Sequence, residues 1–229
     1  MQRVHSLIDR RIRSRKPAAY LTKEAWLGAY RFYVDERVIV PRSHIAALIE
    51  DRLAPWIAHA GKVGCVLDLC TGSGCLAILL ARAFPRARVD AADVSPSALA
   101  VARINVRQYR LAKQIRLIRS NLYAALHDRR YDLIVSNPPY VTGQAMRRLP
   151  REYRHEPRLA LAGGRNGLDL VRTILREAPR HLHPGGMLVM EVGGGRKRVE
   201  RAFPAIEFTW IDTPGGGDVL AVSREQLPS

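Results

Sequence analysis

The chain has 229 residues, enough for one large hydrophobic core or for one core with a small appended segment. Hydrophobic residues make up 47% and charged residues 25% of the sequence, a balance typical of globular proteins that excludes a disordered or collagen-like chain. Three cysteines cannot all pair with one another, which argues against a secreted disulfide framework. No apolar run approaches the roughly 20 residues of a membrane-spanning helix, so we expect no membrane association.

The sequence is strongly basic, with a formal net charge of +16. This excess favours an anionic partner such as RNA or a ribonucleoprotein. The alternative is a basic, well-solvated surface that binds no such partner.

The sequence predicts that the N-terminal 60 residues form a segment distinct from the alternating strands and helices that follow. Residues 1–16 carry apolar side chains at helical spacing, and Pro17 ends the expected helix. Two short β-prone runs in residues 31–40 predict a hairpin around Asp35 and Glu36. Ser43 then predicts the N-cap of a helix that continues to about His59.

From Cys65 onward, strand-like runs alternate with helical patterns. This alternation predicts an α/β, Rossmann-like, doubly wound and mostly parallel sheet of seven strands. The last two strands are joined by a glycine-rich turn too short for a helix, so we expect the last strand to be antiparallel. The expected strands cover residues 65–70, 88–93, 115–120, 131–137, 186–192, 207–212 and 219–224.

A glycine-rich turn follows the first of these strands and indicates a nucleotide-type site. Gly72 and Gly74 let the backbone approach a ligand, and the helix that begins there offers free N–H groups. Asp93 ends the next strand, where a carboxylate can bind ribose hydroxyls. The same spacing also fits a nicotinamide dinucleotide, which leaves a dehydrogenase open. Asp68 favours an amino-acid-like cofactor such as S-adenosylmethionine, because it would attract an ammonium and repel a pyrophosphate.

The run from Asn137 to Tyr140 (Asn-Pro-Pro-Tyr) ends the fourth strand, at the same edge of the sheet. The Asn side-chain oxygen and a proline carbonyl can accept the two hydrogens of one NH2 group, and Tyr140 can lie over a planar group. Such a grip would hold a planar nitrogen against an electrophilic methyl group.

These motifs resemble class I S-adenosylmethionine-dependent methyltransferases that act on NH2 groups. Residues 32–43, together with residues 149–157 and 161–169, are similar to the protein-glutamine N5-methyltransferase family. Within it, residues 149–157 and 161–169 resemble the PrmB-type branch, which methylates a glutamine of large-subunit ribosomal protein 3. The alternatives are the sister branch that acts on peptide release factors, and the N6-adenine methyltransferases of nucleic acid. A third alternative is an RNA-binding module with a degenerate cofactor site.

The resemblance implies two sets of site residues, an S-adenosylmethionine cofactor and S-adenosylhomocysteine as a product. The residues that we expect to act on the amide are Asn137, Pro138, Pro139 and Tyr140. The residues that we expect to bind the cofactor are Asp68, Cys70, Thr71, Gly72, Ser73, Gly74, Asp93, Asn121, Leu122 and Asn137. Asn121 departs from the family, which commonly has Asp there, so cofactor binding is expected to be altered.

The resemblance also implies a domain organisation and a setting. We expect residues 1–60 to hold the remnant of a helical substrate-docking domain, the hairpin and a linker helix, and residues 61–229 to form the methyltransferase domain. The expected partner is the ribosomal protein, free or in an assembly intermediate, with rRNA touching the basic surface in the bacterial cytoplasm. We expect no metal, because the five-residue spacing of Cys65, Cys70 and Cys75 is not that of zinc ligands. Glu191 ends the fifth strand without an assigned role.

Overall fold

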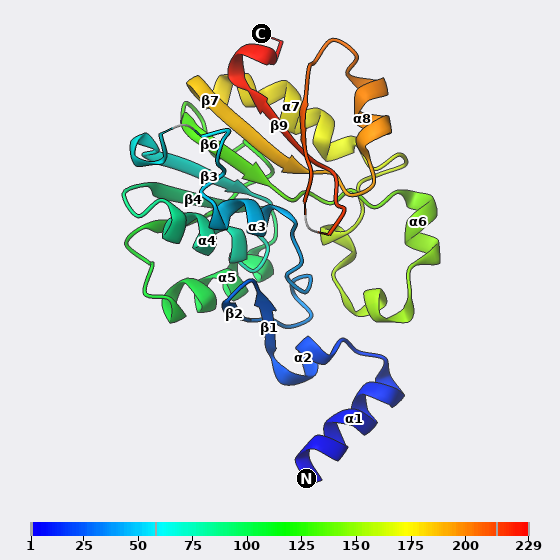
Figure 1. Ribbon diagram of the computed structural model, residues 1–229. Helices are drawn as coiled ribbons and strands as arrows, with labels where there is room; N and C mark the ends of the chain where they lie inside the picture. The colour runs from blue at the N-terminus through cyan, green and yellow to red at the C-terminus, as the bar shows by residue number, and fades with distance from the viewer. Residues whose placement is uncertain (1, 58, 214, 229) are drawn as a thin grey trace.

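The computed structural model describes residues 2–57, 59–213 and 215–228. A seven-stranded sheet forms its centre, with the strand order β5-β4-β3-β6-β7-β9-β8 (Figure 1). Its strands are β3 (Cys65–Leu69), β4 (Arg88–Asp93), β5 (Ile115–Arg119), β6 (Tyr131–Ser136), β7 (Leu182–Glu191), β8 (Thr209–Ile211) and β9 (Val219–Ser223). All seven predicted strands are therefore confirmed.

The strand directions also agree with the prediction. Neighbours from β5 through β7 pair in parallel, whereas β9 is antiparallel to both β7 and β8. The order reverses at β3, whose neighbours are β4 on one side and β6 on the other. A reversal of this kind opens a crevice at the carboxyl ends of the strands, which is where doubly wound sheets bind ligands.

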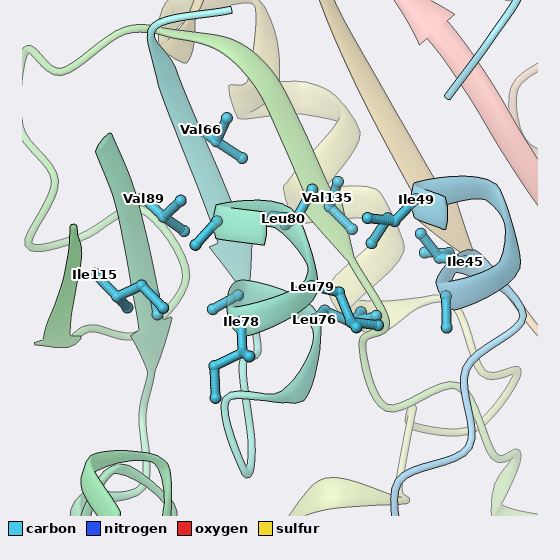
Figure 2. Close-up of a cluster of buried hydrophobic side chains, with 14 of the residues drawn as sticks. Ile45, Ile49, Val66, Leu76, Ile78, Leu79, Leu80, Val89, Ile115 and Val135 are labelled. Atoms are coloured by element: carbon cyan, nitrogen blue, oxygen red, sulfur yellow. The ribbon is translucent and has the colours of Figure 1, made fainter. Parts of the chain in front are cut away.

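Helices cover both faces of the sheet, and alternate residues of each strand pack against opposite layers. Val66 of β3 packs with α4 (Cys75–Ala83) and α5 (Pro96–Gln108), and its neighbour Leu67 packs with α7 (Asp169–His181). Figure 2 shows the first layer, in which Ile45 and Ile49 of α3 (Ile45–Glu50) join the side chains of α4. The remaining helices are α1 (Gln2–Ser14), α2 (Ala18–Thr22), α6 (Gly143–Arg148) and α8 (Arg196–Ala202).

The predicted hairpin was misplaced. The hairpin consists of β1 (Glu24–Leu27) and β2 (Tyr30–Tyr33), where Gly28 takes a positive φ of 56° in the two-residue turn. Residues around Asp35 form a local turn instead, because the Asp35 carboxylate accepts hydrogen bonds from the backbone and side chain of Arg37.

The predicted helix over residues 43–59 is much shorter than expected. The helix α3 ends at Glu50, and Arg52 and Leu53 then adopt positive φ angles that do not continue a helix. The N-cap is His44, and the Ser43 hydroxyl before it donates to the Glu191 carboxylate at 2.7 Å while accepting the Ile45 N–H at 3.3 Å. The predicted helix of residues 1–16 is confirmed as α1.

The N-terminal segment shares a core with the sheet. Tyr20, Phe32 and Val34 are buried in the same apolar cluster as α4 and Val66. The predicted division into residues 1–60 and residues 61–229 as separate domains therefore stays a prediction.

No helix in the described part of the chain is long and apolar enough to cross a membrane.

Asn105 of α5 connects the hairpin to the glycine-rich turn and is fully buried. Its amide oxygen accepts the Tyr33 N–H at 2.8 Å, and its amide nitrogen donates to the carbonyls of Tyr33 and Ser73 at 3.0 and 2.9 Å. Removing this side chain leaves three buried or partly buried backbone groups without their partner.

Asn105→Ala is therefore expected to lower the free energy of unfolding by about 2–3 kcal/mol, measured by urea denaturation. Ile104→Ala on the same helix is the control, because Ile104 is 40% exposed and should cost less than about 1 kcal/mol. Equal losses for the two variants would contradict this role of Asn105.

Candidate active site

The turn between β3 and α4 has the conformation that its glycines predict. Gly72 and Gly74 adopt positive φ angles of 56° and 79°. A Cβ at Gly74 would lie 3.1 Å from the Ala102 Cβ, so a side chain there would crowd α5, whereas the space beside Gly72 is open. The turn therefore packs tightly on the helix side and leaves its backbone accessible on the other side.

Asp68 lies beneath this turn and is completely buried. One carboxylate oxygen, Oδ2, accepts hydrogen bonds from the Thr71 hydroxyl and from the Ala77 N–H, the latter at 2.9 Å. The other oxygen, Oδ1, has no partner among the described residues. Burial raises the pKa of Asp68 to about 7. These contacts make Asp68 a brace for the turn, and its predicted contact with a cofactor ammonium stays a prediction.

Asp93 ends β4 and lies beside the turn. Its carboxylate accepts the Gly72 N–H at 2.8 Å and the Ser95 N–H at 2.9 Å. Burial raises the pKa of Asp93, and these two N–H groups partly oppose that shift. Each oxygen keeps a further lone pair, so the carboxylate can still accept a hydroxyl from a ligand.

A cavity of about 340 Å³ opens in front of the turn, at the carboxyl ends of β3, β4 and β6. Most of the predicted site residues line it: Cys70, Thr71, Gly72, Ser73, Asp93, Asn121, Leu122, Asn137 and Pro139. Asp68, Gly74, Pro138 and Tyr140 are not part of its wall. The structure thus brings the glycine turn, Asp93 and the Asn-Pro-Pro-Tyr run together around one space.

Asn137 comes directly after β6, and its side chain forms no hydrogen bond within the described residues. The strand end is held by Ser136, whose hydroxyl donates to the Leu69 carbonyl at 2.8 Å. Asn137 therefore lines the cavity with an amide oxygen and an amide nitrogen that have no hydrogen-bond partner among the described residues.

Tyr140 is positioned by a buried carboxylate that sequence reasoning left without a role. Glu191, 1% exposed at the end of β7, accepts the Tyr140 hydroxyl at 3.0 Å. Burial, together with the Glu191 charge, raises the pKa of Tyr140, so its phenol stays a donor. A Cβ at Gly193 would lie 2.5 Å from the Tyr140 ring, so the glycine makes room for it.

The second oxygen of Glu191 holds the opposite wall of the cavity. It accepts the Ser43 hydroxyl at 2.7 Å and the His44 N–H at 2.9 Å. The adjacent Arg42 forms a two-pronged ion pair with Glu156 and stacks over the Tyr153 ring at 4.8 Å. Arg42 and Ser43 line the cavity, so these contacts place the segment before α3 against it.

Sequence reasoning missed Arg42, Glu156 and Glu191 as site residues. Arg42 and Glu156 lie in two of the three stretches that carry the family resemblance, and this was the signal that could have found them. Glu191 offered only its position at the end of a strand. Within the described residues, no group of three or more His, Cys, Asp or Glu side chains is placed to hold a metal ion.

Comparisons with known proteins agree with this fold. Residues 52–152 match the family model of the methyltransferase small domain. A solved methyltransferase from Pyrococcus furiosus superimposes with a TM-score of 0.61 at 18% identity, covering 98% of this chain and 99% of that one. The fold is therefore that of the class I methyltransferases, which confirms the predicted fold class.

Curated relatives identify the family. The chain is 56% identical over 226 residues to the ribosomal protein uL3 glutamine methyltransferase of Bordetella pertussis (strain Tohama I), covering 98% of this chain and 76% of the relative. It is 52% identical to the enzyme of the same name from Burkholderia pseudomallei (strain K96243), covering 99% and 76%. The chain belongs to the ribosomal protein uL3 glutamine methyltransferase family. The resemblance seen in residues 32–43 and 149–169 is thereby confirmed.

Glu191→Gln is expected to slow methyl transfer by about tenfold or more while changing cofactor affinity less than threefold. The substituted amide cannot accept from both the Tyr140 hydroxyl and the Ser43 and His44 donors, so Tyr140 loses its fixed orientation. Single-turnover rates with saturating substrate, together with calorimetric cofactor binding, measure the two effects separately.

The double variant with Tyr140→Phe decides whether Glu191 acts through Tyr140. If it does, the double variant is no slower than the slower single variant, because both remove the same interaction. Multiplicative losses in the double variant would contradict this positioning role.

Proposed function

We propose that this protein transfers a methyl group from S-adenosylmethionine to the side-chain amide nitrogen (N5) of a glutamine in ribosomal protein uL3. The observation that carries the proposal is Asn137, whose amide has no partner among the described residues and lines the cavity next to Pro139 and the glycine turn. The family membership and the enzyme names of the relatives support the substrate. Action on this partner implies a place in the bacterial cytoplasm.

The residues of the cavity fit S-adenosylmethionine. The open space at Gly72 admits a ligand against the backbone of the turn, and the Asp93 carboxylate beside it suits ribose hydroxyls. Asn121 and Leu122 line the neighbouring wall, where an amide and an aliphatic side chain suit the edge and face of an adenine. When bound, this cofactor supplies an electrophilic methyl group on a sulfonium.

The Asn-Pro-Pro-Tyr run can present the substrate amide to that methyl group. The Asn137 side-chain oxygen and a proline carbonyl accept the two N–H groups of the glutamine amide and so fix its plane. The amide nitrogen is a weak nucleophile because its lone pair is delocalised, and holding it in a reactive orientation lowers the entropic part of the barrier. After transfer the nitrogen carries an acidic proton, which leaves to water without a strong base.

The rim of the cavity offers a surface for the peptide that carries the glutamine. Leu159 lines the cavity although it is 62% exposed, so it presents an apolar contact at the entrance. Its segment is anchored by Glu156, which pairs with Arg42 from the other side of the entrance. We propose that the substrate loop enters between these two segments.

Asn137→Ala tests the amide grip. Methyl transfer to uL3 is expected to fall by at least a hundredfold, because the amide loses an acceptor that orients it, while cofactor affinity changes less than threefold. A single-turnover assay with labelled cofactor and calorimetry measure the two quantities.

Asn121→Ala is the matched control, because it removes an amide from the cofactor wall of the same cavity. It should weaken cofactor binding and leave the rate at saturating cofactor within about threefold. An Asn137→Ala enzyme with normal turnover would overturn the proposed grip.

A further inference from the structure

A second hollow lies at the amino ends of the parallel strands, away from the cavity just described. It encloses about 790 Å³ and is lined by the first residues of β3, β4, β5 and β6 and by the end of α5. Cys65, Arg88 and Ile115 begin three adjacent strands there, whereas the methyltransferase cavity lies where the same strands end. The two sites therefore occupy opposite edges of the sheet.

The side chains of this hollow are strongly basic. Five of them are exposed and form no ion pair with the described residues: Arg88, Arg103, Arg107, Lys113 and Arg130. We call these five residues the basic cluster. Arg103 and Arg107 are one helical turn apart on α5, so they lie on the same face of that helix.

A single carboxylate organises the floor of the hollow. Asp90 accepts two hydrogen bonds from Arg116, at 3.0 and 2.7 Å, and one from Arg129 at 3.0 Å. The Tyr131 hydroxyl donates to the same carboxylate at 2.8 Å. This network holds two further guanidinium groups in fixed positions, and it uses the one acidic side chain that lines the hollow in the described part of the chain.

We propose that this hollow binds the phosphodiester backbone of RNA. Guanidinium groups match the geometry of phosphate oxygens, and a row of them across neighbouring strands suits a chain of regularly spaced anions. None of the large apolar side chains that the described structure leaves exposed lines the hollow. Protein partners are usually anchored by such side chains, so a hollow whose exposed side chains are mostly basic favours a nucleic acid.

The choice of RNA rests on the proposed ribosomal substrate, which is associated with RNA in its assembled form. The placement at the opposite edge of the sheet leaves the methyltransferase cavity free while RNA is bound. The hollow would thus keep the enzyme on an RNA-bearing assembly while the cavity engages the protein.

The test measures binding of a short fluorescein-labelled RNA hairpin by anisotropy, with the protein alone and over a range of salt concentrations. The triple variant Arg103→Ala/Arg107→Ala/Lys113→Ala should weaken binding about tenfold or more near 0.1 M salt. The slope of log Kd against log salt should also fall by about 2–3, because each phosphate that the variant no longer neutralises lowers the slope by about one.

The triple variant Lys197→Ala/Arg198→Ala/Arg201→Ala on α8 is the matched control. It removes the same two Arg and one Lys from exposed positions, and α8 lies far from α5 (Figure 1). The control should change Kd less than threefold. Equal weakening by both variants, or equally strong competition by polyglutamate, would overturn the proposal.

Methylation of purified uL3 without RNA separates this inference from the proposed function. The triple variant of the basic cluster should methylate free uL3 at the normal rate and bind cofactor normally, which also shows that it is folded. If the wild-type protein binds the hairpin but methylates no glutamine, the proposed function fails and RNA binding stands. If the wild-type protein methylates uL3 but does not bind the hairpin, the proposed RNA binding fails and the proposed function stands.

Discussion

The buried carboxylate of Glu191 is the contact on which the site depends. It stands at the end of β7 and accepts hydrogen bonds from Tyr140 on one side and from Ser43 and His44 on the other. Its two oxygens thus join the Asn-Pro-Pro-Tyr run to the segment that forms the opposite wall. A buried carboxylate is stable only when its oxygens accept hydrogen bonds, so the two walls and the Glu191 side chain stabilise one another.

The Arg42–Glu156 pair extends this connection to the entrance. It links the segment before α3 to the segment that carries Leu159, and the Arg42 guanidinium also lies over the Tyr153 ring. Loss of either partner would leave the other charge partly buried and unpaired. The side of the cavity formed by the glycine turn is built differently, because Asp68 and Asp93 fix this turn through backbone N–H groups.

Much of the fold could be predicted from the sequence because its signals are local. The seven strands follow from short apolar runs separated by helical patterns, and the tight turn after β3 follows from Gly72 and Gly74. The contacts that complete the site join residues far apart in the chain, such as Ser43 with Glu191 and Arg42 with Glu156. Periodicity and motif spacing carry no information on such pairs. The misplaced hairpin shows a related difficulty. The β-prone residues 31–40 predicted the turn around Asp35, whereas the hairpin turn lies at Gly28.

The most direct measurement of the central claim uses ribosomal protein uL3 from cells that lack its methyltransferase. The protein would be incubated with uL3, total RNA, release factors and radiolabelled S-adenosylmethionine, and the labelled products separated and mapped by mass spectrometry. The account predicts label on the side-chain nitrogen of one glutamine in uL3. Label on adenine in RNA or only on a release factor would contradict it, as would the absence of label while the cofactor still binds.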